Sequence, residues 1–197
     1  MQGDLIALVG TSSVGKTTAA EHLQALLPRP YLVVGIDHFL NMFPQRWDGQ
    51  PAGPGVGMWY EDTVDASGSP RSRIRYGAAG AKLLDGMRAA VCALLDTGNS
   101  VVLDEMPLDE TILPAWRERL EGYRVFWVHL HARLAVVEAR EAARTRGQKI
   151  GNARGHQLIT EGMASDFELD VSELTPRETA AAILRAWEGS GPDDHRL

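Results

Sequence analysis

The residues that constrain this chain most strongly lie near its start. Residues 5–9 are all apolar, and Gly-Thr-Ser-Ser-Val-Gly-Lys-Thr follows directly at 10–17, a full match to the pattern G-x-x-x-x-G-K-[ST]. A short apolar run that ends at glycine is typical of a strand buried on both faces. The next segment, 16–27, has helical spacing and stops at Pro28. The match therefore stands between a strand and a helix, the context that predicts a phosphate-binding loop.

The loop has a definite chemistry. Its glycines let backbone N–H groups approach phosphate oxygens, and the helix that follows adds the positive end of its dipole. Lys16 is expected to reach the β- and γ-phosphates of a nucleoside triphosphate, and the Thr17 hydroxyl to bind Mg²⁺. Nothing in the sequence distinguishes ATP from GTP. The predicted nucleotide-binding residues of this loop are Gly10, Thr11, Ser12, Ser13, Val14, Gly15, Lys16, Thr17 and Thr18.

The rest of the chain alternates between apolar runs and segments of helical spacing. The helical segments are long enough to connect parallel strands. Thr175, Pro176 and Glu178 predict the start of the last helix, with a capping threonine, a first-turn proline and a capping-box glutamate. We therefore predict an α/β fold with a five-stranded parallel sheet and helices on both faces. The four further strand segments are 31–36, 101–103, 125–130 and 167–171.

The length of 197 residues fits a single domain. We expect this domain to span residues 1–188, with a flexible tail at 189–197, because no segment separates two parts. One stretch, 44–75, breaks the alternation: half of the positions in 44–57 are Pro or Gly, and polar sequence continues after them. We predict a long irregular loop here, which is a candidate substrate loop.

The charge balance limits the partners of the chain. With 20 Lys and Arg against 26 Asp and Glu, the net charge is −6, so nucleic acid and acidic membrane surfaces are expected to repel it. The single cysteine, Cys92, cannot form an internal disulfide, which suits a reducing compartment. No apolar run is long enough to span a membrane. The sequence thus predicts a cytoplasmic protein without nucleic-acid or membrane partners, and it leaves open whether the chain forms a homo-oligomer.

A basic segment stands out from this acidic background. Residues 133–154 contain six Lys or Arg and two Glu. Arginines that close over a transferring phosphate stabilise its charge and exclude water, so we predict a lid over residues 140–155. The alternative is a solvated helix face on which Glu141 pairs with neighbouring arginines. The predicted lid arginines are Arg140 and Arg144, which we expect to act in catalysis, and Arg146, which we expect to contact the nucleotide.

Two carboxylates end the strand predicted at 101–103. Ligands of open α/β sheets bind at the carboxyl ends of the strands, so we expect Asp104 to hold Mg²⁺ through water beside Thr17. Glu105 either supports Asp104 or activates a water, and we retain it as a candidate at the acceptor end of the site.

The strand at 31–36 ends on Asp37, at the same edge of the sheet, where a carboxylate can orient an acceptor hydroxyl and take its proton. The alternative is that Asp37 is the N-cap of a helix at 38–43. His38 beside it either touches the acceptor or caps a turn. Three aromatic residues of the 44–75 loop either pack it against the domain or line a ligand pocket. The candidate substrate-binding residues are therefore His38, Trp47, Trp59, Tyr60 and Glu105.

Several segments occur in an order and at distances that suggest one known family. They are the phosphate loop at 10–17, the segment 26–40 with its Gly-Ile-Asp, the strand 101–105, the Ala-Arg-Glu-Ala-Ala-Arg run at 139–144, and 161–170. Over residues 4 to 185 the chain resembles chloramphenicol phosphotransferase. The resemblance implies a P-loop kinase fold of the nucleoside-monophosphate-kinase type, and ATP- and Mg²⁺-dependent phosphorylation of an antibiotic hydroxyl.

The resemblance also implies roles for single residues. Asp37 is then the general base, Lys16 and Thr17 bind phosphate and metal, and the two catalytic arginines lie in the lid. The chain departs from the family in 44–75, which is longer and richer in Gly, Pro and Trp. Because pocket walls determine which substrate fits, we expect a bulkier antibiotic, such as one bearing a nucleoside or a sugar. Two alternatives stay open: a zeta-toxin-like kinase of a nucleotide sugar, and a nucleotide-binding switch without a small acceptor.

Overall fold

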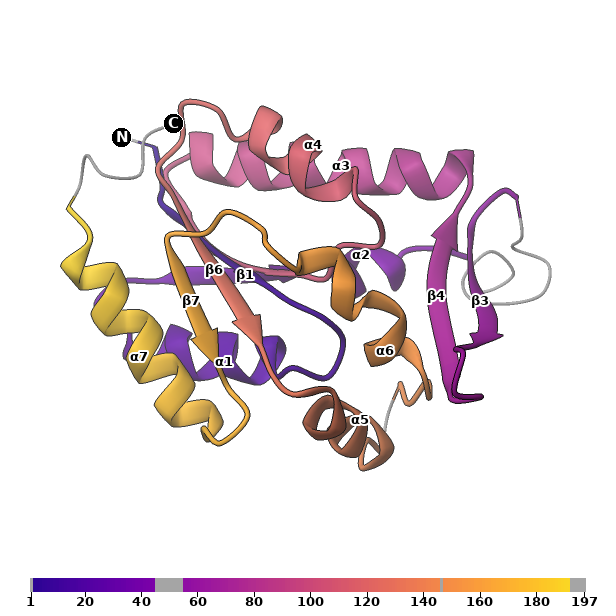
Figure 1. Ribbon diagram of the computed structural model, residues 1–197. Coiled ribbons are helices and arrows are strands. Elements are labelled where there is room, and N and C mark those ends of the chain that lie inside the picture. The colour runs from indigo at the N-terminus through magenta and orange to yellow at the C-terminus, as the bar shows by residue number, and fades with distance from the viewer. Residues whose placement is uncertain (1, 45–54, 146, 192–197) are drawn as a thin grey trace.

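The structure is a computed structural model that describes residues 2–44, 55–145 and 147–191 (Figure 1). At its centre lies a five-stranded sheet of order β2-β5-β1-β6-β7, in which every neighbouring pair is parallel. The predicted five-stranded parallel sheet is therefore confirmed. Its strands are β1 (Leu5–Val9), β2 (Tyr31–Gly35), β5 (Ser100–Glu105), β6 (Val125–His131) and β7 (Phe167–Asp170).

Helices cover both faces of the sheet, as predicted (Figure 1). Side chains alternate along β1, so Leu5, Ala7 and Val9 join the core on one face. Ile6 and Leu8 join the core on the other. Because both faces are buried, the strand is apolar without interruption. The first core is covered by α3 (Ala78–Asp96) and α4 (Ile112–Arg119), and the second by α1 (Lys16–Leu26) and α7 (Pro176–Gly189).

The polar residues that follow three strands meet at one edge of the sheet. β1 leads into the phosphate loop, and β5 ends with Asp104 and Glu105. β2 leads into α2 (Ile36–Leu40), which carries Asp37. The pairing register places Gly35 beside Asp104, so the groups predicted for phosphate, metal and acceptor lie close together.

Residues 58–76 form a β-hairpin, so the irregular loop predicted for 44–75 is wrong over this part. The two strands pair in antiparallel fashion along their full length. They are β3 (Met58–Val64) and β4 (Pro70–Tyr76). Residues 45–54, which include the predicted substrate contact Trp47, lie outside the described residues.

Turn chemistry and two buried side chains explain the hairpin. The Asp65 carboxylate accepts the backbone N–H groups of Ser67 and Ser69, which closes the turn. Met58 and Ile74 are buried in the core beneath α3. Most other side chains of the hairpin are polar and partly exposed, so too few apolar residues remained to reveal the alternation of a strand.

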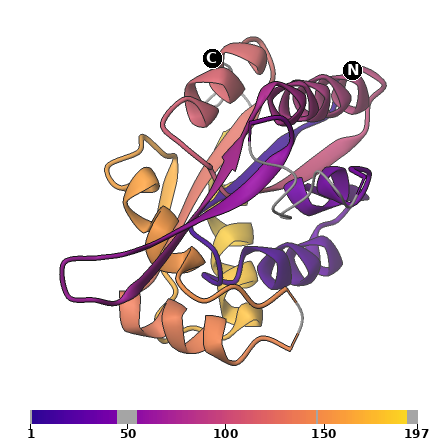
Figure 2. The same cartoon turned by 90° about the vertical axis from the view of Figure 1, so that its right-hand side faces the viewer.

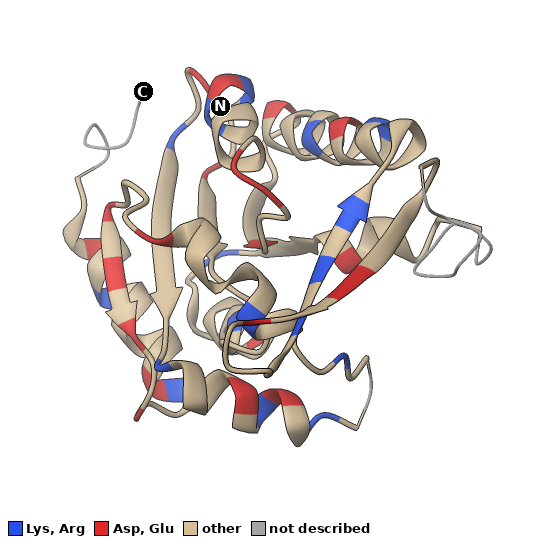
Figure 3. Ribbon diagram, turned by 45° about the vertical axis from the view of Figure 1, so that its right-hand side comes forward, with Lys and Arg blue, Asp and Glu red and all other residues tan. Residues whose placement is uncertain are grey.

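The segment between β6 and β7 completes the fold. It contains α5 (Leu134–Ala142), α6 (Asn152–His156) and a short 3₁₀ helix, η2 (Gln157–Thr160). Figure 2 shows the hairpin crossing one side of the molecule with α6 beside it. Basic residues lie along β4, and acidic residues lie along β3 (Figure 3). Within the described ranges, none of the helices has the length and apolar character needed to cross a membrane.

Candidate active site

The phosphate loop, residues 10–17, turns sharply between β1 and α1. Ser13 and Gly15 have left-handed backbone, with φ of 60° and 106°. At Gly10 a Cβ would lie 2.3 Å from the carbonyl oxygen of Leu130 in β6. The two glycines of the motif are therefore required for different reasons, one for conformation and one for close packing.

Lys16 is buried inside this loop, with 6% of its surface exposed. Its Nζ donates to the carbonyl oxygen of Thr11 at 2.8 Å and lies 3.8 Å from Oδ1 of Asp104. Burial lowers the pKa of the Lys16 ammonium, and the carboxylates of Asp104 and Glu105 oppose that effect. The ammonium group is thus held between the loop and the end of β5.

Thr17 and Asp104 form the part of the site that fits a metal ion. The Thr17 hydroxyl donates to Oδ2 of Asp104 at 2.5 Å. Hydroxyl and carboxylate oxygens suit Mg²⁺, which nucleotide sites hold with one or two protein groups together with phosphates and water. Over the described ranges, no three His, Cys, Asp or Glu side chains are grouped to bind a metal by themselves. The donors present therefore fit the predicted Mg²⁺ rather than a metal bound by protein alone.

Asp37 lies in the first turn of α2, and the N-cap of this helix is Gly35. The alternative that Asp37 caps a helix at 38–43 is therefore wrong. The Asp37 side chain is exposed and borders the pocket that the phosphate loop also lines. His38 accepts the backbone N–H of Gly35 through Nδ1 at 3.0 Å, so it caps the helix while it also borders the pocket.

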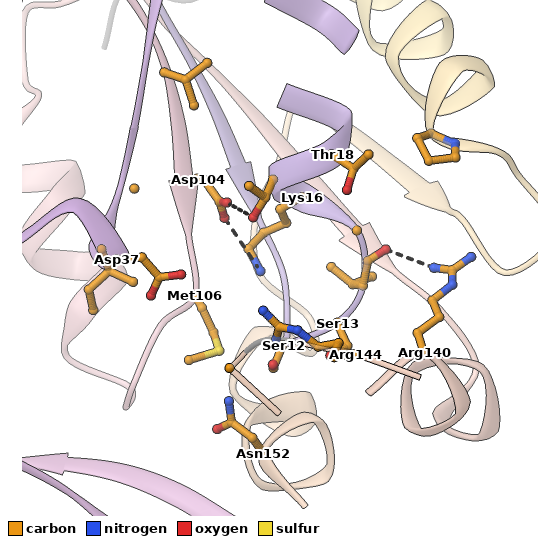
Figure 4. Close-up of a pocket in the computed structure, with 18 of the residues that line it drawn as sticks. Ser12, Ser13, Lys16, Thr18, Asp37, Asp104, Met106, Arg140, Arg144 and Asn152 are labelled. Carbon is orange, nitrogen blue, oxygen red and sulfur yellow. Dashed lines mark hydrogen bonds and ion pairs between the residues drawn. The ribbon is translucent and has the colours of Figure 1, made fainter. Parts of the chain in front are cut away.

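A pocket of about 530 Å³ connects these groups (Figure 4). Figure 4 shows Asp37, Asp104 and Lys16 around it, each from a different element. At the other end, α2, the hairpin and the residue after β5 provide mainly apolar walls. The pocket therefore joins a phosphate-binding end to a more apolar end. Its apolar lining there includes Ile36, Leu40, Tyr60, Ile74 and Met106.

Among the predicted acceptor-side residues, Tyr60 borders the pocket, but Trp59 and Glu105 do not. Consecutive residues of a strand point to opposite faces, so Trp59 is directed away from the face of Tyr60. Glu105 is only 2% exposed, and its Oε2 accepts the indole N–H of Trp116 at 2.6 Å. Burial raises the pKa of this carboxyl to about 7. Such burial does not fit contact with an acceptor, and agrees better with support of Asp104 from within the core.

The predicted lid arginines are placed differently from one another. Arg140 donates to the carbonyl oxygens of Val14 at 3.0 Å and Val171 at 2.9 Å, which ties the phosphate loop to the end of β7. Arg144 is exposed just beyond the end of α5 and borders the pocket. Arg146 lies outside the described residues.

Two other basic residues of the predicted lid are paired with acids. Lys149 binds Asp62 of β3 at 2.7 Å. Arg154 lies 2.6 Å from carboxylate oxygens of both Glu138 and Asp65. The pairs with Asp62 and Asp65 join the lid segment to the hairpin, and the pair with Glu138 joins Arg154 to α5. The basic composition of the lid did not reveal these connections between distant segments.

Glu141 is a residue whose position the sequence interpretation missed. It is 2% exposed, so the alternative of a surface partner for arginines is wrong. Its Oε2 accepts the N–H of Gly151 at 2.7 Å, and its Oε1 accepts the N–H of Ala153 at 2.8 Å. The available signal was its spacing of four from Val137, which places both side chains on the buried side of α5.

These observations define a class of enzyme. A phosphate loop between the first strand and helix contains a buried lysine, and its threonine meets an aspartate at the carboxyl edge of a parallel sheet. One pocket extends from this loop to α2 and the hairpin. The molecule is a P-loop kinase, a phosphotransferase.

The model of the family described as "Chloramphenicol phosphotransferase-like protein" matches residues 3–188, so the chain belongs to this family. The resemblance seen in the sequence is thereby confirmed. A curated relative is the Mycobacterium tuberculosis (strain H37Rv) protein named "Putative O-phosphotransferase Rv2636". It is 28% identical over 191 residues, which cover 95% of this chain and 83% of the relative.

Solved structures share the fold. A sugar kinase from Janibacter is 17% identical with a TM-score of 0.66, over 94% of this chain and 95% of that one. The Mycobacterium tuberculosis APS kinase in complex with AMPPNP and APS is 17% identical with a TM-score of 0.61, over 95% and 98%. The Deinococcus radiodurans tunicamycin resistance protein is 15% identical with a TM-score of 0.60, over 93% and 95%. These likenesses confirm the predicted kinase fold.

Proposed function

We propose that this phosphotransferase uses ATP or GTP to phosphorylate a hydroxyl group of an antibiotic, with Asp37 as general base, and thereby inactivates the antibiotic. The observation that supports this most is the shared pocket, which Asp37, Lys16 and Asp104 all border. Phosphoryl transfer depends on holding the acceptor oxygen in line with the phosphate. The carboxylate that positions the acceptor hydroxyl therefore has to share one cavity with the phosphate loop.

At the nucleotide end, each residue has a separate task. The loop N–H groups bind phosphate oxygens, and Lys16 neutralises charge on the β- and γ-phosphates. Thr17 and Asp104 hold Mg²⁺, which when bound neutralises further phosphate charge. Arg144 adds positive charge at the pocket rim.

Two other lid arginines serve the same end of the site. Arg140 keeps the phosphate loop joined to β7 through its two carbonyl contacts. We propose Arg146, outside the described residues, as a nucleotide contact.

At the acceptor end, Asp37 orients the hydroxyl and accepts its proton as the oxygen attacks. His38 contacts the acceptor beside it. Tyr60 and the apolar walls bind the less polar part of the antibiotic, because burying apolar surface in such a pocket is favourable. Trp47 is a further candidate contact.

Two comparisons support an antibiotic as the acceptor. The family takes its description from chloramphenicol phosphorylation, and one protein of the same fold is a tunicamycin resistance protein. We propose that the reaction takes place in the cytoplasm, where nucleoside triphosphates are available.

A phosphotransfer screen tests this proposal. The purified protein is incubated with Mg²⁺, with ATP or GTP, and with a panel of antibiotics that includes nucleoside and sugar-bearing compounds. Mass spectrometry then reports any antibiotic that gains a phosphate. An added phosphate on one hydroxyl is the expected result. Nucleotide hydrolysis without modification of any compound would contradict the antibiotic acceptor.

Asp37→Asn tests the proposed base. We expect kcat to fall by about a hundredfold or more, because general base catalysis contributes that much, while nucleotide affinity stays within about twofold. Asp85→Asn is the control, since Asp85 is an exposed carboxylate of α3 that does not border this pocket. If Asp37→Asn retains full turnover, Asp37 is not the base.

A further inference from the structure

Helix α6 and the glycine before it form a junction between three distant parts of the site. We call residues 151–156 the α6 junction. All of them except Arg154 are buried. The junction contacts α5, the phosphate loop and the hairpin, and its hydrogen bond to the phosphate loop joins two residues 142 positions apart in the sequence. A segment this short and buried cannot move without disturbing its neighbours.

Glu141 fixes this junction to α5. The first N–H groups of a helix have no partner within it, and here the two Glu141 oxygens accept from Gly151 and Ala153. Hydrogen bonds to an ionised acceptor are stronger than neutral ones, and these two are short, at 2.7 and 2.8 Å.

The carbonyl groups of the same two residues bind the two sides of the active site. The Ala153 carbonyl oxygen accepts the Thr11 hydroxyl of the phosphate loop at 2.8 Å. The Gly151 carbonyl oxygen accepts the backbone N–H of Ser72 in β4 at 2.9 Å. Glu141 therefore binds the N–H groups of Gly151 and Ala153. The carbonyl group of Ala153 binds the phosphate loop, and that of Gly151 binds the hairpin.

Further contacts make the attachment to the hairpin close. Arg73 Nε donates to the Gly155 carbonyl oxygen at 3.0 Å, and the Ile74 N–H donates to Nε2 of His156 at 3.3 Å. Burial lowers the pKa of His156 to about 4, so the ring stays neutral and can accept at neutral pH. A Cβ at Gly155 would lie 1.7 Å from the Ser72 carbonyl oxygen. Ile74 itself borders the pocket.

We infer that Glu141 is a positioning residue that couples the phosphate loop to the acceptor side: through the α6 junction it sets the position of the hairpin according to the state of the nucleotide end. The expected effect of Glu141 on the acceptor KM rests on the proposed function. The structural effect of Glu141 on the hairpin can be measured without any acceptor.

Hydrogen exchange at the hairpin provides the first test. A non-hydrolysable ATP or GTP analogue with Mg²⁺ is expected to slow exchange of the Ser72 and Ile74 amides by about fivefold or more in the wild type. In Glu141→Gln, the side-chain NH₂ group faces the N–H of either Gly151 or Ala153, so one hydrogen bond is lost. We expect the analogue to slow exchange of the two hairpin amides by less than about twofold in this variant, although calorimetry still detects binding of the analogue. Equal slowing in both proteins would overturn the inference.

Two further variants separate coupling from general destabilisation. Thr11→Val removes the hydroxyl that binds Ala153, so it should also abolish the nucleotide effect on Ser72 and Ile74 at an analogue concentration at which calorimetry shows the variant to be saturated. Val91→Ala creates a cavity in the core beneath α3 and should keep the nucleotide effect. If Thr11→Val keeps the effect, or Val91→Ala loses it, the coupling does not pass through the α6 junction.

Failure of the proposed function gives a different result. If neither analogue binds the wild type, the inference is judged on basal exchange, which Glu141→Gln should speed by about tenfold or more at Ser72 and Ile74. Unchanged basal exchange would then overturn the inference.

Once an acceptor is known, kinetics provide a second test. Glu141→Gln should raise the acceptor KM by about tenfold and change kcat by less than about threefold. A fall in kcat alone would contradict a role in positioning the acceptor side.

Discussion

Replacing Glu105 by glutamine should make the stability of the protein less sensitive to a rise in pH from 5 to 8. The Glu105 carboxyl is buried at the end of β5, and one oxygen accepts the indole N–H of Trp116. The other oxygen has no hydrogen-bond partner among the described residues. Burial raises the pKa of this group from 4.5 to about 7, so the folded protein retains a proton that the unfolded chain has already lost.

The size and sign of the effect follow from this difference in pKa. A group that is harder to ionise in the folded state destabilises the fold as the pH rises from the unfolded pKa to the folded one. Since a change of one in pKa corresponds to about 1.4 kcal/mol, the wild type should lose about 2 to 3 kcal/mol of unfolding free energy between pH 5 and pH 8 through Glu105. Glutamine keeps a carbonyl oxygen for Trp116 and does not ionise.

Urea denaturation of both proteins at pH 5 and pH 8 measures this prediction. Glu105→Gln should gain about 2 to 3 kcal/mol relative to the wild type between the two pH values. Ile183→Val, a core substitution in α7 that changes no titratable group, should cost about 1 kcal/mol at both pH values. If the difference between wild type and Glu105→Gln is the same at pH 5 and pH 8, the Glu105 carboxyl is not neutral in the folded protein.

Two further predictions concern the proposed metal site and the α6 junction. Asp104→Asn should weaken nucleotide binding by about tenfold or more in the presence of Mg²⁺ and leave binding in EDTA unchanged. Calorimetry under both conditions measures this, and equal weakening with Mg²⁺ and in EDTA would contradict a role of Asp104 in holding the metal. Gly155→Ala should destabilise the protein by about 1 to 3 kcal/mol in urea denaturation, because its Cβ would meet the Ser72 carbonyl. Gly86→Ala on α3 is the control, since nothing lies within 4 Å of its Cβ and it should be neutral or slightly stabilising. Equal effects of the two alanines would refute the contact between α6 and β4.

The sheet and the position of the phosphate loop could be predicted because their signals are local. The phosphate loop is a contiguous motif, and its conformation depends on glycines within it. Asp104 and Asp37 could be placed near Lys16 because parallel strands align their carboxyl ends, whichever loops connect them.

The hairpin and the acceptor end could not be read in the same way. The hairpin buries few side chains. Its apolar positions are mainly Met58 and Ile74, which pack under a helix that comes later in the chain.

Glu105 and Asp104 are adjacent in sequence, yet Glu105 is buried against Trp116 and Asp104 meets Thr17. Which of two neighbouring carboxylates faces the site depends on the pleat of β5 and on what covers each face.

By itself, the sequence determined that this chain forms a parallel α/β sheet with a phosphate-loop motif at its carboxyl edge, because periodicity and a contiguous motif specify both. Only the tertiary structure decided that Arg140 binds Val14 and Val171, and that Glu141 turns inward to bind the α6 junction. Buried polar groups have to find partners when the chain packs, and those partners come from segments far apart in the sequence.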